Sequence, residues 1–253
     1  MMTRKICGLV AAAGLFAMLA GCGTRSISDS GYREHGWHSP ENPYYQGELN
    51  ELDALGIRES DTVVEADIQA ALNDAAAVQL RRGDAILLIQ SGAMFPDDAM
   101  LNAMQADFTV TPLSGIPNRP AKSAQASSAP AAENAPLNLV LRLAAARSGA
   151  TALIVYWGVL ESAQENQVTK TVSWTPIIGA LIPDEVQRMR IRLKGVVMDV
   201  RSGKWVMLTP PAIDNARLSA RIERETADQR QVSLLKEQAY AGFVTLLRQR
   251  FGL

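Results

Sequence analysis

Apolar and polar positions follow two different periods along the first half of the chain. Apolar residues at spacings of three and four predict a helix over residues 60–82, which ends at Gly83. The continuous apolar run 84–90 predicts a strand covered on both faces. A second helix over 96–106 and a strand over 108–111 follow. This alternation of helix and strand is typical of a layered α/β structure.

The second half of the chain repeats the alternation. A helix is predicted over 137–148, and a buried strand over 150–157. Residues 187–200 then alternate strictly, and a turn at 201–204 leads into an apolar strand over 205–208, which is a hairpin signal. The chain finishes as a helix. We therefore predict an α/β fold, with mixed α+β as the variant: a single mixed β-sheet of about five strands, flanked by helices, with a C-terminal helix.

Residues 114–136 interrupt the pattern. Ala, Ser and Pro fill 15 of these 23 positions, without aromatic residues or an apolar period, so we expect a disordered stretch. We interpret it as a long loop inside one domain, since residues 58–113 alone would form too small a core. The predicted domain therefore spans 58–253 and contains the disordered loop 114–136.

The N-terminus has the organisation of a secretory signal. Arg4 and Lys5 precede an apolar run over 6–20, which small residues and Cys22 follow. The run is about five residues too short to cross a bilayer. We expect residues 1–21 to be a signal peptide that is removed.

The last residues of that signal, Leu19, Ala20, Gly21 and Cys22, resemble the lipobox of bacterial lipoproteins. The resemblance implies that Cys22 becomes the first residue and carries a diacylglycerol and an N-linked acyl chain such as palmitate. Two or three acyl chains form a stable membrane anchor. In this family Gly23, in place of Asp, indicates the periplasmic face of the outer membrane, with the inner membrane as the alternative.

Residues 22–57 have the composition of a lipid-anchored tether, with many Gly, Ser, Asn and Pro. Four aromatic residues are unusual for such a spacer: Tyr32, Trp37, Tyr44 and Tyr45. We expect part of this segment to lie on the domain surface; partner binding is the alternative.

Charge and cysteine content exclude several classes. Loss of Arg4 and Lys5 leaves about 23 basic against 26 acidic residues, so nucleic acid is not an expected partner. Cys7 leaves with the signal and Cys22 is modified, so no thiol remains for a disulfide or a cysteine-based metal site.

Histidine is the usual general base near neutral pH and a common metal ligand. His35 and His38 are the only two, and both lie in the predicted tether. A Ser-His-Asp site inside the domain is therefore excluded. We predict no cofactor, no metal and no catalytic residue.

Other polar residues have simpler interpretations. Ser91 follows a strand but lacks the first glycine of a nucleophile elbow. Asp97 and Asp98 begin a predicted helix, where capping and the helix dipole explain them. A carboxylate-based cell-wall hydrolase, using for example Asp84 and Glu161, is an alternative that the sequence leaves open.

Two segments are candidate partner-binding surfaces. The first is a row of cations on one face of the strand 187–200, opposite Met189, Ile191 and Leu193. Its members are Arg188, Arg190, Arg192 and Lys194. Such a row can meet lipopolysaccharide phosphates, peptidoglycan carboxylates or an acidic protein. The second is the apolar loop 174–183, with Trp174, Ile177 and Ile178, which either packs on the core or forms a contact.

The helix and strand over 143–156, with the hairpin turn at 200–204, resemble the α/β domain of periplasmic lipoproteins related to the curli-secretion lipoprotein and the N-terminal domain of the Tol translocation protein. The resemblance covers roughly residues 60–250. It implies, as an alternative, a self-assembling secretion or pore lipoprotein with residues 166–183 as a membrane-inserting hairpin. Lys170 and two prolines speak against this, and we find no pair of ten-residue alternating strands.

The function predicted from the sequence is non-catalytic. We expect an outer-membrane-anchored periplasmic lipoprotein that binds or assembles with another cell-envelope component, either an envelope protein or an anionic envelope polymer. Oligomers are compatible with this interpretation.

Overall fold

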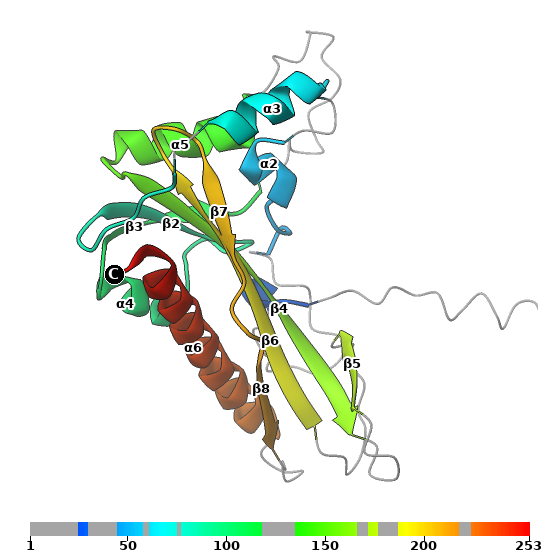
Figure 1. Cartoon of the computed structure of the whole chain (residues 1–253). Helices are drawn as coiled ribbons and strands as arrows, with labels where there is room; N and C mark the ends of the chain where they lie inside the picture. The colour runs from blue at the N-terminus through cyan, green and yellow to red at the C-terminus, as the bar shows by residue number, and fades with distance from the viewer. Residues whose placement is uncertain are drawn as a thin grey trace, which may run out of the picture.

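A computed structural model describes most of the chain from residue 25 onward. The described residues are 25–29, 45–57, 61–74, 77–117, 135–165, 172–176, 187–217 and 224–253. Within them, eight strands form one mixed sheet, and four of the five α-helices contribute to its two faces (Figure 1). The predicted fold class is confirmed. The five strands that the sequence predicted form the main path of the sheet, in the order β3-β2-β4-β6-β7.

Three parallel strands form one side of the sheet. β2 (Ala85–Ser91) lies between β3 (Thr109–Gly115) and β4 (Ala152–Glu165) and is parallel to both. α4 (Asp98–Gln105) connects β2 to β3, and α5 (Leu137–Arg147) precedes β4. Parallel strands need such crossovers, which explains the alternating pattern of the sequence.

Two long antiparallel strands form the middle of the sheet. β4 has 14 residues and pairs along almost all of its length with the 13-residue β6 (Gln187–Asp199), which turns into β7 (Trp205–Leu208). β4 does not alternate along its whole length, but the sequence predicted this strand only to residue 157 and so missed the length of the pair. Because the first half of β4 is buried on both faces, it reads as a continuous apolar run, and the length of the strand is hidden.

Three short strands extend the edges, and the sequence predicted none of them. β1 (Arg25–Ser26) and β5 (Val172–Pro176) pair with the second half of β4, while β8 (Ile213–Arg217) pairs with the first half of β6. All three are antiparallel to their partners. They widen the sheet where the long strands run beyond β2 and β7 (Figure 1).

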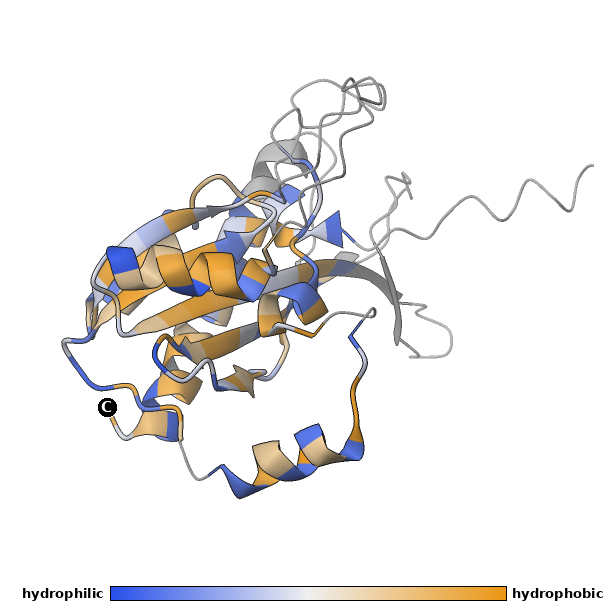
Figure 2. Ribbon diagram, turned by 90° about the horizontal axis from the view of Figure 1, so that it is seen from above, coloured by the Kyte–Doolittle hydropathy of each residue, from blue (hydrophilic) through white to orange (hydrophobic). Residues whose placement is uncertain are grey.

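Each face of the sheet has its own apolar core. α4 and α6 (Arg224–Phe251) cover one face, and α2 (Glu51–Leu55) with α5 covers the other. The central strands are largely hydrophobic, as Figure 2 shows. Alternate residues of one strand serve the two cores, so Ile154 belongs to the first and Val155 to the second.

The helix predicted over 60–82 is much shorter in the structure. α3 (Glu65–Asn73) ends where Asp74 adopts an extended conformation, and residues 77–81 are not helical. Leu80 is then buried in the core, so tertiary packing of this segment overrides the helical period. The apolar side of α3 stays exposed, with Ile68 at 47% and Leu72 at 72%.

The predicted disordered loop lies mostly outside the described residues, which stop at residue 117 and resume at 135. Its first two residues, Ser114 and Gly115, are in β3, so the loop begins later than predicted. The helices of the described ranges include none that is long and apolar enough to span a bilayer.

Candidate interaction surface

The predicted alternation of β6 is confirmed where its side chains are described. Met189, Ile191 and Leu193 are at most 3% exposed and belong to the core beneath α6. Arg190 and Arg192 point to the opposite face. Lys194 follows on the same face, and we call these three residues the cation row. The side chain of Arg188, which the sequence placed in the same row, lies outside the described residues.

Acidic residues pair with every member of the cation row. Glu161, opposite Arg190 on β4, accepts a hydrogen bond of 2.6 Å from its Nε and lies 3.7 Å from an Nη of Arg192. Lys194 forms an ion pair with Glu51 of α2. The pairs are unequal, since the side chain of Arg190 is 21% exposed and that of Arg192 is 62% exposed. Arg192 therefore presents most of its charge to solvent.

A second layer of contacts joins the cation row to the segment before α2. Lys194 lies 6.0 Å from the ring centroid of Trp157, and the Trp157 indole donates a hydrogen bond of 2.9 Å to the Leu49 carbonyl. Next to Leu49, burial raises the pKa of the Glu48 carboxyl, while a hydrogen bond with Ser26 and the charge of Lys194 act in the opposite direction. One oxygen of this carboxyl is buried without a hydrogen-bond partner. Glu48 thus lies between β1 and the cation row, where burial disfavours the charged form of its carboxyl.

The beginning of the predicted tether is built into the sheet. Arg25 and Ser26 lie opposite Leu160 and Val159 of β4. The next residue, Ile27, is 1% exposed and belongs to the core beneath α6. We expected surface contacts for this segment, and the structure shows a core residue five positions after Cys22.

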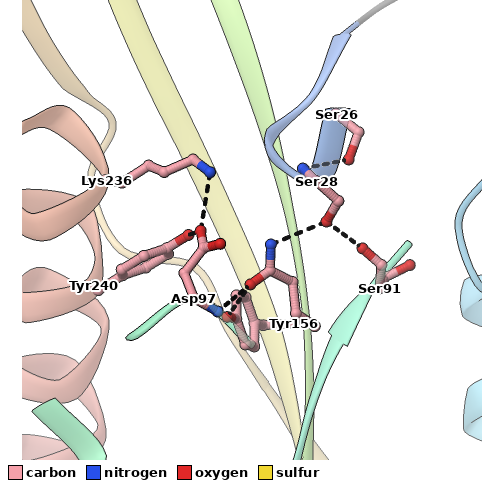
Figure 3. Close-up of polar contacts among 8 residues, drawn as sticks. Ser26, Ser28, Ser91, Asp97, Tyr156, Lys236 and Tyr240 are labelled. Carbon is pink, nitrogen blue, oxygen red and sulfur yellow. Dashed lines mark hydrogen bonds and ion pairs between the residues drawn. The ribbon is translucent and has the colours of Figure 1, made fainter. Parts of the chain in front are cut away.

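A buried hydrogen-bond network fixes the same segment from the inside (Figure 3). The Gln90 amide donates to Ser28 Oγ at 3.0 Å, and Ser28 Oγ donates to the Ser91 carbonyl at 2.6 Å. The Gln90 carbonyl oxygen accepts from the Tyr156 hydroxyl at 2.6 Å and from the Asp97 backbone N–H at 2.8 Å. The sequence analysis missed this network, although a polar Gln90 inside an apolar strand was a signal for it.

Asp97 connects the network to α6. Its carboxylate accepts hydrogen bonds from the Tyr240 hydroxyl and, at 2.9 Å, from the Lys236 ammonium (Figure 3). Asp97 is the N-cap residue of α4 as predicted, but its side chain makes no capping hydrogen bond, so that part of the interpretation is wrong. Burial, followed by the nearby Tyr156 and Asp97, raises the pKa of Tyr240 well above its ordinary value. Tyr240 therefore stays protonated and donates.

The remaining candidates for catalysis are Ser91, which has a structural role, and the pair Asp84 and Glu161, which lie far apart. Ser91 is 1% exposed, and its hydroxyl accepts a hydrogen bond from the Leu49 N–H, so it has no access to a substrate. Asp84 precedes β2 at one end of the sheet, and Glu161 lies near the other end of β4. With β2 and β4 in parallel register, about 11 residues separate the two along the sheet, or roughly 35 Å. This pair cannot act on one glycosidic bond.

Several residues considered in the sequence analysis lie outside the described residues. These are Cys22, His35, His38, Ile177 and Ile178. Trp174 is described only in its backbone, which pairs with Ala163 in the β4–β5 hairpin. In the part of the chain that the structure describes, no group of three or more His, Cys, Asp or Glu side chains is placed to hold a metal ion.

Comparison with known families shows the class of protein to which this α/β domain belongs, a bacterial lipoprotein. The chain belongs to the YafT bacterial lipoprotein family, whose model matches residues 50–250. No curated protein matches the sequence.

Proposed function

We propose that this lipoprotein is attached through Cys22 to the periplasmic face of the outer membrane, and that it acts by binding rather than by catalysis. The cation row is its contact for an anionic component of the cell envelope. The observation that carries the binding proposal is the exposed guanidinium of Arg192, on a part of the sheet face that lies beyond α2 and α5.

The attachment rests on the family and on the N-terminal sequence. The lipobox-like residues Leu19 to Cys22 end a signal-like segment, and Arg25 enters the sheet three residues later. Gly23 after the cysteine favours the outer membrane. Covalent acyl chains supply about 0.8 kcal/mol for each buried methylene, so two or three chains anchor the protein without any other membrane segment.

The proposed binding surface rests on a difference in ion pairing and exposure among the three residues of the cation row. Arg190 and Lys194 have close acidic partners, so their charges mainly hold β4, β6 and α2 together. Arg192 is only loosely paired, at 3.7 Å, and exposed. An exposed cation accelerates association with an anionic partner and makes the binding sensitive to salt.

This proposal is tested by comparing the binding of two variants that each lose one positive charge. Arg192→Gln should weaken retention of the protein on immobilised lipopolysaccharide, peptidoglycan fragments or anionic lipid, whichever the wild type binds, and should reduce the salt dependence. Arg250→Gln, at the exposed C-terminal end of α6, removes the same charge elsewhere and should bind as the wild type does. Equal binding by both variants would reject the cation row as the contact.

Assembly into a secretion or pore complex is a second candidate, which the long β4–β6 pair favours. The first three residues of the predicted apolar loop 174–183 belong to β5, which pairs with the end of β4. If this segment is a contact between copies, Ile177→Asp and Ile178→Asp should reduce the native mass of the detergent-extracted protein. A monomeric mass for the wild type would exclude this candidate.

A further inference from the structure

The distance between the lipid and the domain is limited by the chain itself. Arg25 is three residues after Cys22, and an extended backbone covers at most about 3.6 Å per residue. The two Cα atoms are therefore at most roughly 11 Å apart. Ile27 in the core and Ser28 in the buried network prevent β1 from peeling away to lengthen this connection.

The direction of β1 tells which part of the sheet meets the membrane. β1 is antiparallel to β4, with Arg25 opposite Leu160 and Ser26 opposite Val159. The chain before Arg25 therefore leads away from β2 and toward the end of β4 at Glu165. That is the end where β5 and β8 pair with the long strands (Figure 1).

Arg192 lies close to this exit point. In the sheet register Val159 has Ser26 on one side and Arg192 on the other. Neighbouring strands are about 4.8 Å apart, so the Cα atoms of Ser26 and Arg192 are separated by roughly 10 Å. Arg190 and its partner Glu161 lie two rows further toward the exit, on the same face of the sheet as Arg192.

We propose that the short connection from Cys22 holds the β1 edge of the sheet against the membrane, where Arg192 contacts the phosphates of anionic lipid headgroups. This inference rests on the proposed attachment at Cys22 and names the anionic component as the lipid of the anchoring membrane itself. A free polymer or a distant protein is the competing partner.

The proposed contact depends on the distance between the cation row and the lipid surface. Attraction between a cation and an anionic lipid surface falls off within a Debye length, which is about 8 Å at physiological ionic strength. A long tether would let the domain leave this zone. The connection of at most roughly 11 Å, added to the roughly 10 Å between the Cα atoms of Ser26 and Arg192, limits the Cα of Arg192 to roughly 21 Å from that of Cys22, so its side chain can reach this zone and the contact favours one orientation of the domain on the lipid.

The orientation is measurable because the mature chain has no free thiol once Cys22 is acylated. Single dye labels are placed at Gln46→Cys and Gln249→Cys in the lipidated protein, reconstituted in phosphatidylcholine vesicles that carry an acceptor dye on the headgroup. Both glutamines are exposed. Gln46 lies two residues from Glu48, which is hydrogen-bonded to Ser26 of β1. Gln249 lies near the C-terminal end of α6, the end far from β1. Its neighbour Arg248 donates a hydrogen bond to Asp107.

The proposal predicts stronger energy transfer from the label at residue 46 than from the label at residue 249. Insertion of ten Gly and Ser residues between Thr24 and Arg25 should abolish the difference. Equal transfer from both sites in the unmodified chain would overturn the orientation. Failure of the protein to float with the vesicles, or to carry acyl chains, would instead overturn the attachment on which the inference rests.

The headgroup contact is tested in the same assay by adding phosphatidylglycerol. Transfer from residue 46 should increase, and Arg192→Gln should remove the increase by more than half, while Arg250→Gln leaves it unchanged. Thermal melts check that both variants fold. An increase that Arg192→Gln does not alter would overturn the lipid contact and return the cation row to a protein or polymer partner.

Discussion

Ile27 packs directly on Gly158, at a place in the sheet where no larger residue fits. A Cβ atom on Gly158 would lie 2.6 Å from Ile27 Cδ1. Gly158 is part of β4, and its lack of a side chain lets the chain after Cys22 enter the core beneath α6. This contact joins the segment that follows Cys22, the proposed anchor, to the folded domain.

The first prediction concerns this contact. Gly158→Ala should destabilise the protein by about 1–3 kcal/mol, because its methyl group overpacks against Ile27 and Leu193. Ile27→Ala should cost about 2–5 kcal/mol through the cavity that it leaves. Gly242→Ala, a helical position with open space around it, should stabilise by about 0.5–1 kcal/mol. Urea unfolding of the three variants measures these values, and a neutral Ile27→Ala would show that the segment is not part of the core.

The second prediction concerns the buried network. Asp97→Asn should lower the stability by about 1–3 kcal/mol, because Tyr240 and Lys236 lose a charged acceptor. Asp98→Asn is the matched control, since Asp98 is exposed in the first turn of α4, and it should change the stability by about 0.5 kcal/mol or less. Thermal melts of both variants distinguish a structural Asp97 from a mere surface charge, for which the two would melt alike.

Glu48 gives a pH-dependent prediction. Its pKa is raised in the folded protein, chiefly by burial, so the folded state favours the neutral acid. This contribution to stability is complete below the ordinary value of 4.5 and is lost as the pH rises through the raised value. Glu48→Gln should therefore raise the melting temperature by a few degrees at pH 7.5 and have no effect at pH 3.5. A constant difference across this range would show that the titration of Glu48 does not contribute.

The structure predicts different stability effects for Arg190 and Arg192, although both are arginines on the same face of β6. Arg190→Gln should destabilise by about 1–3 kcal/mol, because Glu161 is 14% exposed and would lose its closest cation. Arg192→Gln should cost about 0.5 kcal/mol or less, as exposed pairs usually do. From the sequence alone we would expect both to be equally exposed. Similar melting temperatures for the two variants would contradict the geometry described here.

The sequence predicts well what depends on local periodicity. The alternation around Ile191 and the apolar run around Leu88 define strands, and their burial follows directly. It fails where the structure depends on distant pairing. Ser26 lies in a strand of two residues, too short for any pattern, and Ser28 binds Gln90 across 62 positions of sequence. The paired acids of the cation row, such as Glu51, are also invisible until the sheet is assembled.

The helix predicted over 60–82 fails for a different reason. Ile68 and Leu72 have the spacing of a helical apolar face, yet both remain exposed. The pattern identifies a helix but does not say whether an element is available to cover it, and here Leu80 enters the core from an extended segment.

The most direct test of attachment through Cys22 is mass spectrometry of the N-terminal peptide of the protein extracted from purified outer membranes. We expect Cys22 as the first residue, with a diacylglycerol on its sulfur and an acyl chain on its amino group. We expect the Cys22→Ala variant to be absent from the membrane fraction. An N-terminus at any other residue, an unmodified Cys22, or a Cys22→Ala variant that still fractionates with the membrane would contradict it.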